Sequence, residues 1–252
     1  MHPILLTIGS ISFHSYGLMV ALGFAAGLFL TIHFAGKEGI AAEIILDLAI
    51  YVIISAIIGA RLFYVLGQPE YFLASPVEII MLQNGGLVFL GGLLLSILTI
   101  IIYARVKALP VLKLLDAITP GTILGYCIGR IGCFLNGCCF GLPTKLPWGI
   151  TFPTSSLADF YFPGKSLHPT QLYSSLIMLG AFAVLVLISR SKKFDGQVLC
   201  WGLILYSVYR FLIEFLRYSP IHWLRLTPSQ WLVAALFSFG AWGLFYYRKR
   251  AR

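Results

Sequence analysis

The segment from Gly129 to Gly141, GRIGCFLNGCCFG, places residues that could do chemistry at the end of an apolar stretch. Arg130 carries a planar guanidinium whose N–H groups match the oxygens of a phosphate or carboxylate. Asn136 adds a polar amide, and three cysteines add thiols. The glycines permit positive φ and exposed backbone amides, or simply tight helix packing. Because Arg130 has no acid nearby in the sequence, we expect it to bind an anion.

The overall composition indicates the environment of this segment. The chain has 252 residues, of which 59% are hydrophobic and 11% are charged. A soluble core of this size cannot hide so much apolar surface, so the class is integral membrane protein. The net charge of +9 does not indicate nucleic-acid binding, because the basic residues are spread between and at the ends of apolar segments and do not form one polar domain. The N-terminus lacks a basic region before its apolar run, so we expect no cleavable signal peptide.

Seven apolar segments approach or exceed the length of about 20 residues that spans a bilayer. We therefore expect an all-α polytopic membrane protein with one membrane-embedded domain, residues 1–252, and one polar outer loop at about residues 142–169. Paired glycines in the third segment and Pro120 in the fourth predict bent or re-entrant backbone. The segments are Tyr16–Phe34, Ile40–Leu66, Ile79–Tyr103, Leu112–Leu135, Thr170–Ser189, Gln197–Leu216 and Pro228–Tyr247.

The distribution of basic residues orients these segments. If the N-terminus is outside, most lysines and arginines fall on the inner side, so the positive-inside rule favours an outer N-terminus and a cytoplasmic C-terminus. The inner residues are then Lys37, Arg105, Lys107, Lys113, Arg190, Lys192, Lys193, Arg248, Lys249, Arg250 and Arg252.

Three arginines, Arg61, Arg130 and Arg210, fall inside apolar segments. At about 1.5 Å per residue from the inner end of each segment, all three lie in the outer half of the membrane. An arginine is costly there, so several at one depth predict an anion pocket. Two alternatives remain open. Glu214 could neutralise Arg210 from four positions along a helix, and Arg61 could snorkel to the outer surface.

The cysteines allow a second kind of chemistry. Cys127 and Cys200 lie in helical segments and are expected to pack as small apolar side chains. The three cysteines of the opening segment lie at the outer face, where a disulfide is an option. No histidine stands at ligand spacing, so we expect no metal ion, and we expect no cofactor. A membrane thiol–disulfide oxidoreductase and a small-anion transporter are rival functions, although the sequence has neither a C-x-x-C pair nor internal repeats.

Together with four further segments, GRIGCFLNGCCFG resembles the phosphatidylglycerol–prolipoprotein diacylglyceryl transferases, a family of bacterial inner-membrane enzymes. The further segments are HSYGLM (His14–Met19), NGGLVFLGGLL (Asn84–Leu94), LHPTQLY (Leu167–Tyr173) and YRFLIEFLR (Tyr209–Arg217). The resemblance implies seven helices in the cytoplasmic membrane and an active site open to the outer leaflet. It also implies that the diacylglyceryl group of phosphatidylglycerol passes to the lipobox cysteine thiol of a preprolipoprotein signal peptide, forming a thioether and releasing glycerol phosphate. The expected partners are that lipid, that peptide and the bilayer, with no nucleic acid, and we expect a monomer.

The resemblance assigns roles to matching positions. Arg130 corresponds to the arginine that binds the lipid phosphate, and Arg210 to a second functional arginine, with Glu214 and Arg217 on the same helix face. The expected catalytic residues are Tyr16, Arg130, His168, Arg210 and Glu214. With Arg61 added from the anion-pocket argument, the expected substrate-binding residues are Arg61, Arg130, Asn136, Gly141 and Gln171.

Four positions depart from the family pattern. Cys133 stands where the signature has asparagine, and Cys138 stands where it has glutamate. Leu90 replaces a histidine and Ser174 replaces an acid, so a proposed general base and a polar ligand are missing. The remaining candidates for accepting the thiol proton are His14, His168 and Glu214. A divergent paralogue that acts on another acceptor is therefore an alternative.

Overall fold

The computed structural model describes residues 4–8, 11–82, 85–154 and 156–250. Asn84 and Arg252, which the sequence arguments used, lie outside the described residues. The chain divides into two compact units: unit 1 is Met1–Phe34 with Leu115–Arg252, and unit 2 is Ala35–Leu114. Both units are mainly helical, and unit 1 also holds two short two-stranded sheets.

Six helices in the described part of the chain are long and apolar enough to cross a membrane. This supports a mainly helical, multi-pass membrane protein. The six are α1 (Ser15–Lys37), α2 (Ala42–Leu66), α4 (Phe89–Val106), α5 (Val111–Leu135), α7 (Thr170–Arg190) and α8 (Gln197–Ile213), the last continued by the 3-10 turn η3 (Glu214–Leu216). The seventh predicted segment forms a helix, α9 (Pro228–Arg250), but its serines, glycines and tyrosines make it less apolar than the six.

The third predicted segment, Ile79–Tyr103, is wrong at its start, because α4 begins only at Phe89. Before α4 the chain forms a 3-10 turn, η1 (Pro76–Ile80), and residues 85–88 have irregular backbone. Gly85 and Gly86 have φ of 77° and 78°, a left-handed conformation that cannot continue a right-handed helix. Pro120 has no such effect, since α5 runs through it.

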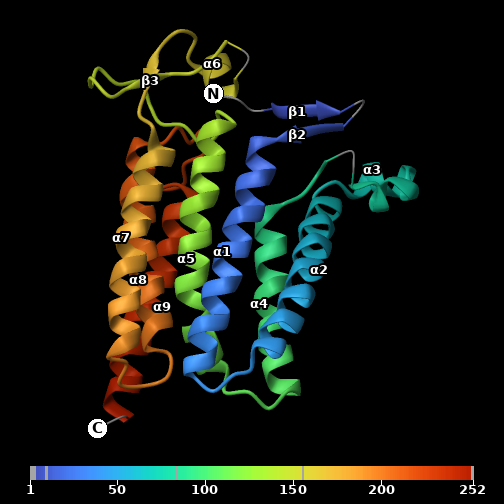
Figure 1. Cartoon of the computed structure of the whole chain (residues 1–252). Helices are drawn as coiled ribbons and strands as arrows, with labels where there is room; N and C mark the ends of the chain where they lie inside the picture. Colours follow the sequence, from blue (N-terminus) through green and yellow to red (C-terminus); the bar gives the residue numbers. More distant parts are fainter. Residues whose placement is uncertain (1–3, 9–10, 83–84, 155, 251–252) are drawn as a thin grey trace. The chain divides into compact units, whose positions relative to one another are not determined.

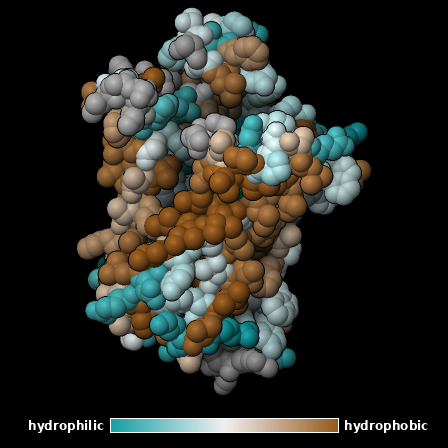
Figure 2. Space-filling model, turned by 90° about the vertical axis from the view of Figure 1, so that its right-hand side faces the viewer, coloured by the Kyte–Doolittle hydropathy of each residue, from teal (hydrophilic) through white to brown (hydrophobic). Residues whose placement is uncertain are grey.

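In unit 2, α2 and α4 pack with their backbones in close contact. A Cβ added to Gly92 would lie 2.8 Å from the carbonyl oxygen of Ala56, so only a glycine fits there. The outward faces of the two helices expose large apolar side chains, including Ile54, Ile58 and Leu98. Figure 2 shows hydrophobic residues gathered over a broad area of this side, with hydrophilic residues toward the upper and lower parts. Such a surface suits contact with lipid.

In unit 1, α1 and α5 approach through a pair of glycines on each helix. A Cβ on Gly23 would lie 2.8 Å from the carbonyl oxygen of Gly125, and one on Gly27 would lie 2.8 Å from that of Gly121. Small residues four positions apart let two membrane helices touch along their backbones. Farther along the chain, α8 packs against both α7 and α9, and the three helices lie side by side in Figure 1.

A buried carboxylate fixes the start of α8 against α5. Asp116 of α5, which is 3% exposed, accepts hydrogen bonds from the backbone N–H groups of Gly196 and Leu199, each at 2.8 Å. These donors belong to the first turn of α8, where the helix itself offers no acceptor. Lys192 Nζ lies 3.4 Å from the same carboxylate and balances its charge. The helix that carries Arg210 is thereby held in register with the helix that carries Arg130.

The predicted polar loop is a small folded layer. Within it, β3 (Ile150–Thr151) pairs with β4 (Ser166–Leu167), and a short helix, α6 (Leu157–Tyr161), lies between them. Its core consists of Phe140, Phe152, Ala158 and Leu167. This layer lies at the end of unit 1 where α5 ends and α7 begins (Figure 1). An antiparallel hairpin, β1 (Ile4–Ile8) and β2 (Ile11–His14), precedes α1 and was not predicted.

Candidate functional site

Arg130 is half-buried near the end of α5 and contacts tyrosines. Its Nη2 donates to Tyr126 Oη at 2.5 Å, and its guanidinium lies 4.6 Å from the centroid of the same ring. Tyr126 Oη is in turn 3.0 Å from Tyr209 Oη of α8. Within the described ranges Arg130 has no carboxylate at ion-pair distance and no second hydrogen bond. Four of its five N–H groups therefore remain available to an anion.

Arg210 has the acidic partner that the sequence suggested. It forms an ion pair with Glu214, and its Nη2 donates to Ser229 Oγ of α9 at 3.1 Å. Arg217 Nη1 lies 3.7 Å from the same Glu214 carboxylate oxygen. Arg210 and Glu214 are 9% and 6% exposed, so the pair is buried. Because one carboxylate faces two guanidinium groups, the cluster keeps an excess positive charge.

A tyrosine of α8 joins the surroundings of Arg130 to the helix that carries Arg210. The ring of Tyr206 packs edge-on against Tyr209 and against Tyr126, whose hydroxyl accepts a hydrogen bond from Arg130. Glu214 pairs with both Arg210 and Arg217, and Arg130 has no carboxylate partner among the described residues, so a positive potential remains that would attract an anion. From the sequence alone, Tyr126, Tyr206 and Tyr209 had no assigned role. A signal was present, because Tyr126 and Tyr206 each stand four positions before an arginine on the same helix.

The end of the signature segment meets two other predicted motifs. Gly141 N donates to the carbonyl oxygen of His168 at 3.0 Å, and Leu142 N donates to that of Leu216 at 2.8 Å. A Cβ on Gly141 would lie 2.6 Å from His168 Cβ and 2.7 Å from the Leu216 oxygen. Gly141 is therefore a packing requirement, where the loop after α5, the start of α7 and the end of α8 come together.

Side chains at the start of α7 hold the backbone of Cys138 and Cys139, in the loop that follows α5. Gln171 Nε2 donates to the carbonyl oxygen of Cys138 at 2.6 Å, and Thr170 Oγ1 donates to that of Cys139 at 2.8 Å. Gln171 is fully buried, and its Oε1 has no partner among the residues described. Ser174, which stands at the family's acidic position, donates to the carbonyl oxygen of Thr170 at 2.5 Å.

His168 lies beside this loop and faces an aromatic pair. Its Nδ1 is 3.5 Å from Tyr173 Oη, which also accepts a hydrogen bond from Trp148 Nε1 at 2.7 Å. The imidazole is half-buried, so it combines a fixed hydroxyl partner with partial access to solvent.

Tyr16 and Asn136 lie at the same end of unit 1. Tyr16 is in the first turn of α1, and its Cδ2 would be 3.4 Å from a Cβ placed on Gly132 of α5. Asn136 directly follows α5, is exposed, and donates its backbone N–H to the carbonyl oxygen of Gly132 at 3.0 Å. The structure thus gathers all the predicted site residues of unit 1 around the ends of α5 and α8 and the starts of α1 and α7.

The five cysteines are all free thiols, so none of the disulfides considered from the sequence is formed. The Sγ atoms of Cys133, Cys138 and Cys139 nevertheless lie within 4.8 Å of one another. Hydrogen bonds from the Cys133 and Cys138 thiols, and then the positive charges of Arg217 and Arg130, lower the pKa of Cys139. The expectation of no metal rested on histidine spacing, and it did not consider three thiols converging at one point.

Arg61 belongs to unit 2 and has an entirely different environment. All five of its N–H donors point to backbone carbonyl oxygens of the segment before α4, and its guanidinium lies 5.5 Å and 5.4 Å from the ring centroids of Tyr64 and Phe72. The acceptors are Ile79 at 2.9 Å, Gly85 at 2.6 Å, Gly86 at 3.1 Å, Met81 at 3.2 Å and Glu78. Leu90, at the position of the family's histidine, is 44% exposed in the first turn of α4.

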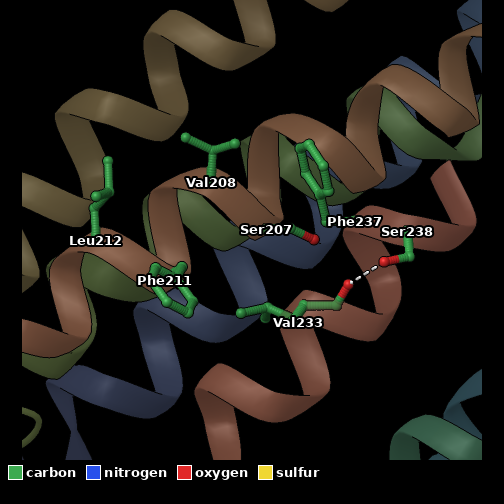
Figure 3. A pocket seen from close by; sticks show the side chains of 8 residues that line it. Ser207, Val208, Phe211, Leu212, Val233, Phe237 and Ser238 are labelled. Atoms are coloured by element: carbon green, nitrogen blue, oxygen red, sulfur yellow. Dashed lines mark hydrogen bonds between the residues drawn. The ribbon is translucent and has the colours of Figure 1, made fainter. Parts of the chain in front are cut away.

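An apolar pocket of ≈ 360 Å³ lies between α8 and α9, and its lining residues on α8 stand on both sides of Arg210 in the sequence. Figure 3 shows its aliphatic and aromatic side chains coming from both helices, with Ser238 hydrogen-bonded to the carbonyl oxygen of Ala234. Ser207 Oγ is buried and has no partner among the described residues. The lining residues are Ser207, Val208, Phe211, Leu212, Val233, Ala234, Phe237 and Ser238.

Comparison with known proteins gives the family. A model of the prolipoprotein diacylglyceryl transferase family matches residues 3–246. Proteins named phosphatidylglycerol–prolipoprotein diacylglyceryl transferase from Finegoldia magna and Clostridium tetani are each 36% identical to this chain, over 88% and 87% of it and over 86% and 87% of their own lengths. The protein of that name from Bordetella parapertussis is 36% identical over 98% of this chain and 95% of its own length. The chain belongs to the prolipoprotein diacylglyceryl transferase family.

Proposed function

We propose that this chain transfers the diacylglyceryl group of phosphatidylglycerol to the lipobox cysteine thiol of a preprolipoprotein. The product is a thioether, and glycerol phosphate leaves. The names of the relatives support both substrates, and family membership favours this transferase reading over a thiol–disulfide oxidoreductase or a small-anion transporter. The observation that carries the proposal is Arg130, a half-buried arginine with no acidic partner among the described residues and with unused donors.

In this proposal Arg130 binds the lipid phosphate and Arg210 stabilises the charge that develops on it. The bond that breaks joins a glycerol carbon to a phosphate oxygen, and its electron pair stays with that oxygen. Fixed guanidinium groups in a site of low dielectric stabilise such a charge without having to reorganise. The excess positive charge of Arg130, Arg210 and Arg217 over Glu214 supports this role. Asn136, which is exposed directly after α5, then contacts the headgroup, and Gly141 supports the site by packing against His168 and Leu216.

The acceptor thiol has to lose its proton, because the thiolate is the nucleophile. Glu214 already pairs with two arginines, so we assign it to positioning them. His168 is our candidate for the proton acceptor, since its ring is half-buried and its backbone pairs with Gly141 at the end of the signature segment. Gln171 supports the loop rather than the lipid, because its amide donates to backbone. Tyr16, in the first turn of α1, completes the site beside Gly132.

The pocket between α8 and α9 suits an acyl chain. Six of its eight lining residues are aliphatic or aromatic, and those on α8, from Ser207 to Leu212, flank Arg210 in the sequence. A lipid whose phosphate meets the arginines would direct its apolar part along such a groove. Burial of the acyl chain in this pocket would hold the reacting carbon near the arginines. The hydrophobic effect that drives such burial is non-directional and roughly proportional to the apolar area removed from water.

For topology, we propose seven spans with α9 as the last, an outer N-terminus and a cytoplasmic C-terminus, in the bacterial cytoplasmic membrane. The bias of basic residues toward one side supports this orientation. We further propose that residues 1–252 act as one membrane-embedded domain and as a monomer, with the folded layer at about residues 142–169 on the outer side.

We do not extend phosphate binding to Arg61. A guanidinium has five N–H donors, and all five of those on Arg61 are used by backbone carbonyls. We propose instead that Arg61 holds the backbone of η1 together with that of Met81, Gly85 and Gly86.

Complementation tests the function. A bacterial strain depleted of its own diacylglyceryl transferase would express this chain, and lipidation of a reporter lipoprotein would be measured by mass spectrometry. We expect rescue by the wild-type chain and none by Arg130→Ala at equal membrane abundance. If the inserted wild-type chain gave no diacylglyceryl-modified reporter, the chain would be a divergent paralogue with another acceptor.

A further inference from the structure

Three thiols converge beside the proposed site without a role in it. The Sγ atoms of Cys133, Cys138 and Cys139 lie within 4.8 Å of one another, and each residue is half-buried. The family signature has asparagine and glutamate at the first two positions, so this cluster is a departure of this chain. Soft thiolate ligands favour metal ions such as Zn²⁺.

The backbone is shaped to bring the three sulfurs together. After α5 ends, Gly137 has φ of 70° and Cys139 has φ of 59°, and the second value is uncommon for a residue with a side chain. In an extended chain, adjacent side chains point to opposite faces. Here the turn places the thiols of two adjacent residues near each other and near Cys133, whose carbonyl oxygen accepts from Cys138 N at 3.1 Å.

Side chains of α7 also hold the backbone of the loop that carries Cys138 and Cys139. Gln171 and Thr170, both buried at the start of α7, donate to the carbonyl oxygens of Cys138 and Cys139 at 2.6 Å and 2.8 Å. The thiols thus project from backbone that is already fixed, as a metal site requires of the protein around it.

Charge and distance both suit a metal–thiolate group. A Zn²⁺ ion with three thiolate ligands carries a net negative charge. The positive charges of Arg217 and Arg130 interact favourably with a thiolate at Cys139 and so offset that charge. Zn–S bonds of about 2.3 Å place tetrahedral sulfur ligands roughly 3.8 Å apart, so the sulfurs would close by about 1 Å at most.

We propose that Cys133, Cys138 and Cys139 bind one Zn²⁺ ion through three thiolates, with its fourth position left to water. The ion ties the outer end of α5 to the loop that α7 supports. The inference does not depend on the transferase reaction, because it rests on the geometry of the thiols.

Metal binding to the full-length protein tests this. The protein would be purified in detergent with a phosphine reductant, stripped with a chelator, incubated with Zn²⁺ alone and desalted. We expect about one zinc per chain, and with Co²⁺ a sulfur-to-cobalt charge-transfer band that Zn²⁺ removes. Cys133→Ser, Cys138→Ser and Cys139→Ser should each weaken binding by more than about tenfold, since loss of even an outer-shell partner costs roughly that. Cys127→Ala and Cys200→Ala, which change buried cysteines elsewhere, should bind like wild type.

A second measurement needs no variant to fold. Zn²⁺ should slow maleimide labelling of the three thiols in the wild-type protein and raise its unfolding temperature. In the triple serine variant, Zn²⁺ should no longer raise that temperature, and stability should fall more than turnover. Equal zinc content in wild type and the triple variant, or labelling that Zn²⁺ leaves unchanged, would overturn the proposal. So would a disulfide among the three cysteines in protein taken directly from cells.

Discussion

Arg61 and Arg130 are both arginines in apolar helices, yet their surroundings are opposite. Arg61 in unit 2 gives all five donors to backbone carbonyls of one segment. Arg130 in unit 1 has one hydrogen bond, to Tyr126, among the residues described. A charged side chain in a membrane-spanning helix is costly unless other side chains, backbone carbonyls or a ligand interact with it. Where the protein supplies every partner, the arginine is structural, and where it leaves donors unused, a ligand is expected to fill them.

Arg210 stands between these extremes. It has a carboxylate partner, but that carboxylate is shared with Arg217. The pairing therefore positions Arg210 without cancelling the positive charge of the cluster. Unused donors and uncompensated charge, rather than the mere presence of an intramembrane arginine, separate the candidate site from the scaffold.

The largest effect is expected at Arg130. Arg130→Ala should lose about 3–4 kcal/mol of transition-state stabilisation, which makes turnover roughly a hundred- to thousandfold slower. Arg130→Lys keeps the charge but loses the planar fork, so it should be impaired less. Purified protein assayed with phosphatidylglycerol and a lipobox peptide measures both. Turnover of Arg130→Ala within a few fold of wild type would remove the phosphate role.

A smaller loss is expected when the shared carboxylate loses its charge. Glu214→Gln leaves Arg210 and Arg217 close together without a counter-charge, so the arginines should move apart from their working positions. We expect kcat to fall roughly tenfold to a hundredfold, or about 1.4–2.7 kcal/mol, while KM for phosphatidylglycerol does not rise. A rise in KM with kcat unchanged would instead place Glu214 in lipid binding.

Tyr126→Phe should be milder still. The ring and its contact with the guanidinium remain, but the hydroxyl that links Arg130 to Tyr209 is lost. A hydrogen bond to a charged group contributes about 1.5 kcal/mol at the lower end, so we expect roughly tenfold weaker activity. Tyr103→Phe is the matched control, since it removes a hydroxyl bonded to Asp47 at 2.7 Å in unit 2 and should leave activity within about twofold. Equal losses in the two variants would indicate a general effect of removing a buried hydroxyl.

The smallest effect on turnover is expected at Arg61, although stability should suffer. Arg61→Lys cannot reach five carbonyls, so the segment 78–86 should become sensitive to proteolysis and the unfolding temperature should fall. Turnover of the protein that remains folded should stay within about threefold, since the change lies in scaffold rather than in a ligand contact. If Arg61→Lys lost as much turnover as Arg130→Lys with no new cleavage, Arg61 would belong with the ligand-binding arginines.

Local patterns predicted most of the helices. The segments that became α1, α2, α5, α7 and α8 were each placed to within a few residues, because a bilayer needs a run of apolar side chains and that run is a property of the chain itself. The exception was the start of α4. There the residues are apolar enough for a helix, but Gly85 and Gly86 have positive φ, so the helix begins only at Phe89. Hydropathy does not determine such a backbone conformation.

The identities of the site residues also came from the sequence, since the motifs could be matched position by position. What only the tertiary structure decided was the partner of each. Arg61, Arg130 and Arg210 were weighed together as parts of one anion pocket, with Glu214 as the alternative partner of Arg210. In the structure Arg61 meets carbonyls 17 to 25 positions away, and Tyr126 meets Tyr209 across 83 positions. Three cysteines that the sequence placed at the outer face form a cluster where Gly137 and Cys139 adopt a left-handed backbone conformation. Residue type sets which interactions a side chain can make, but only the packing of distant segments sets which of them it makes.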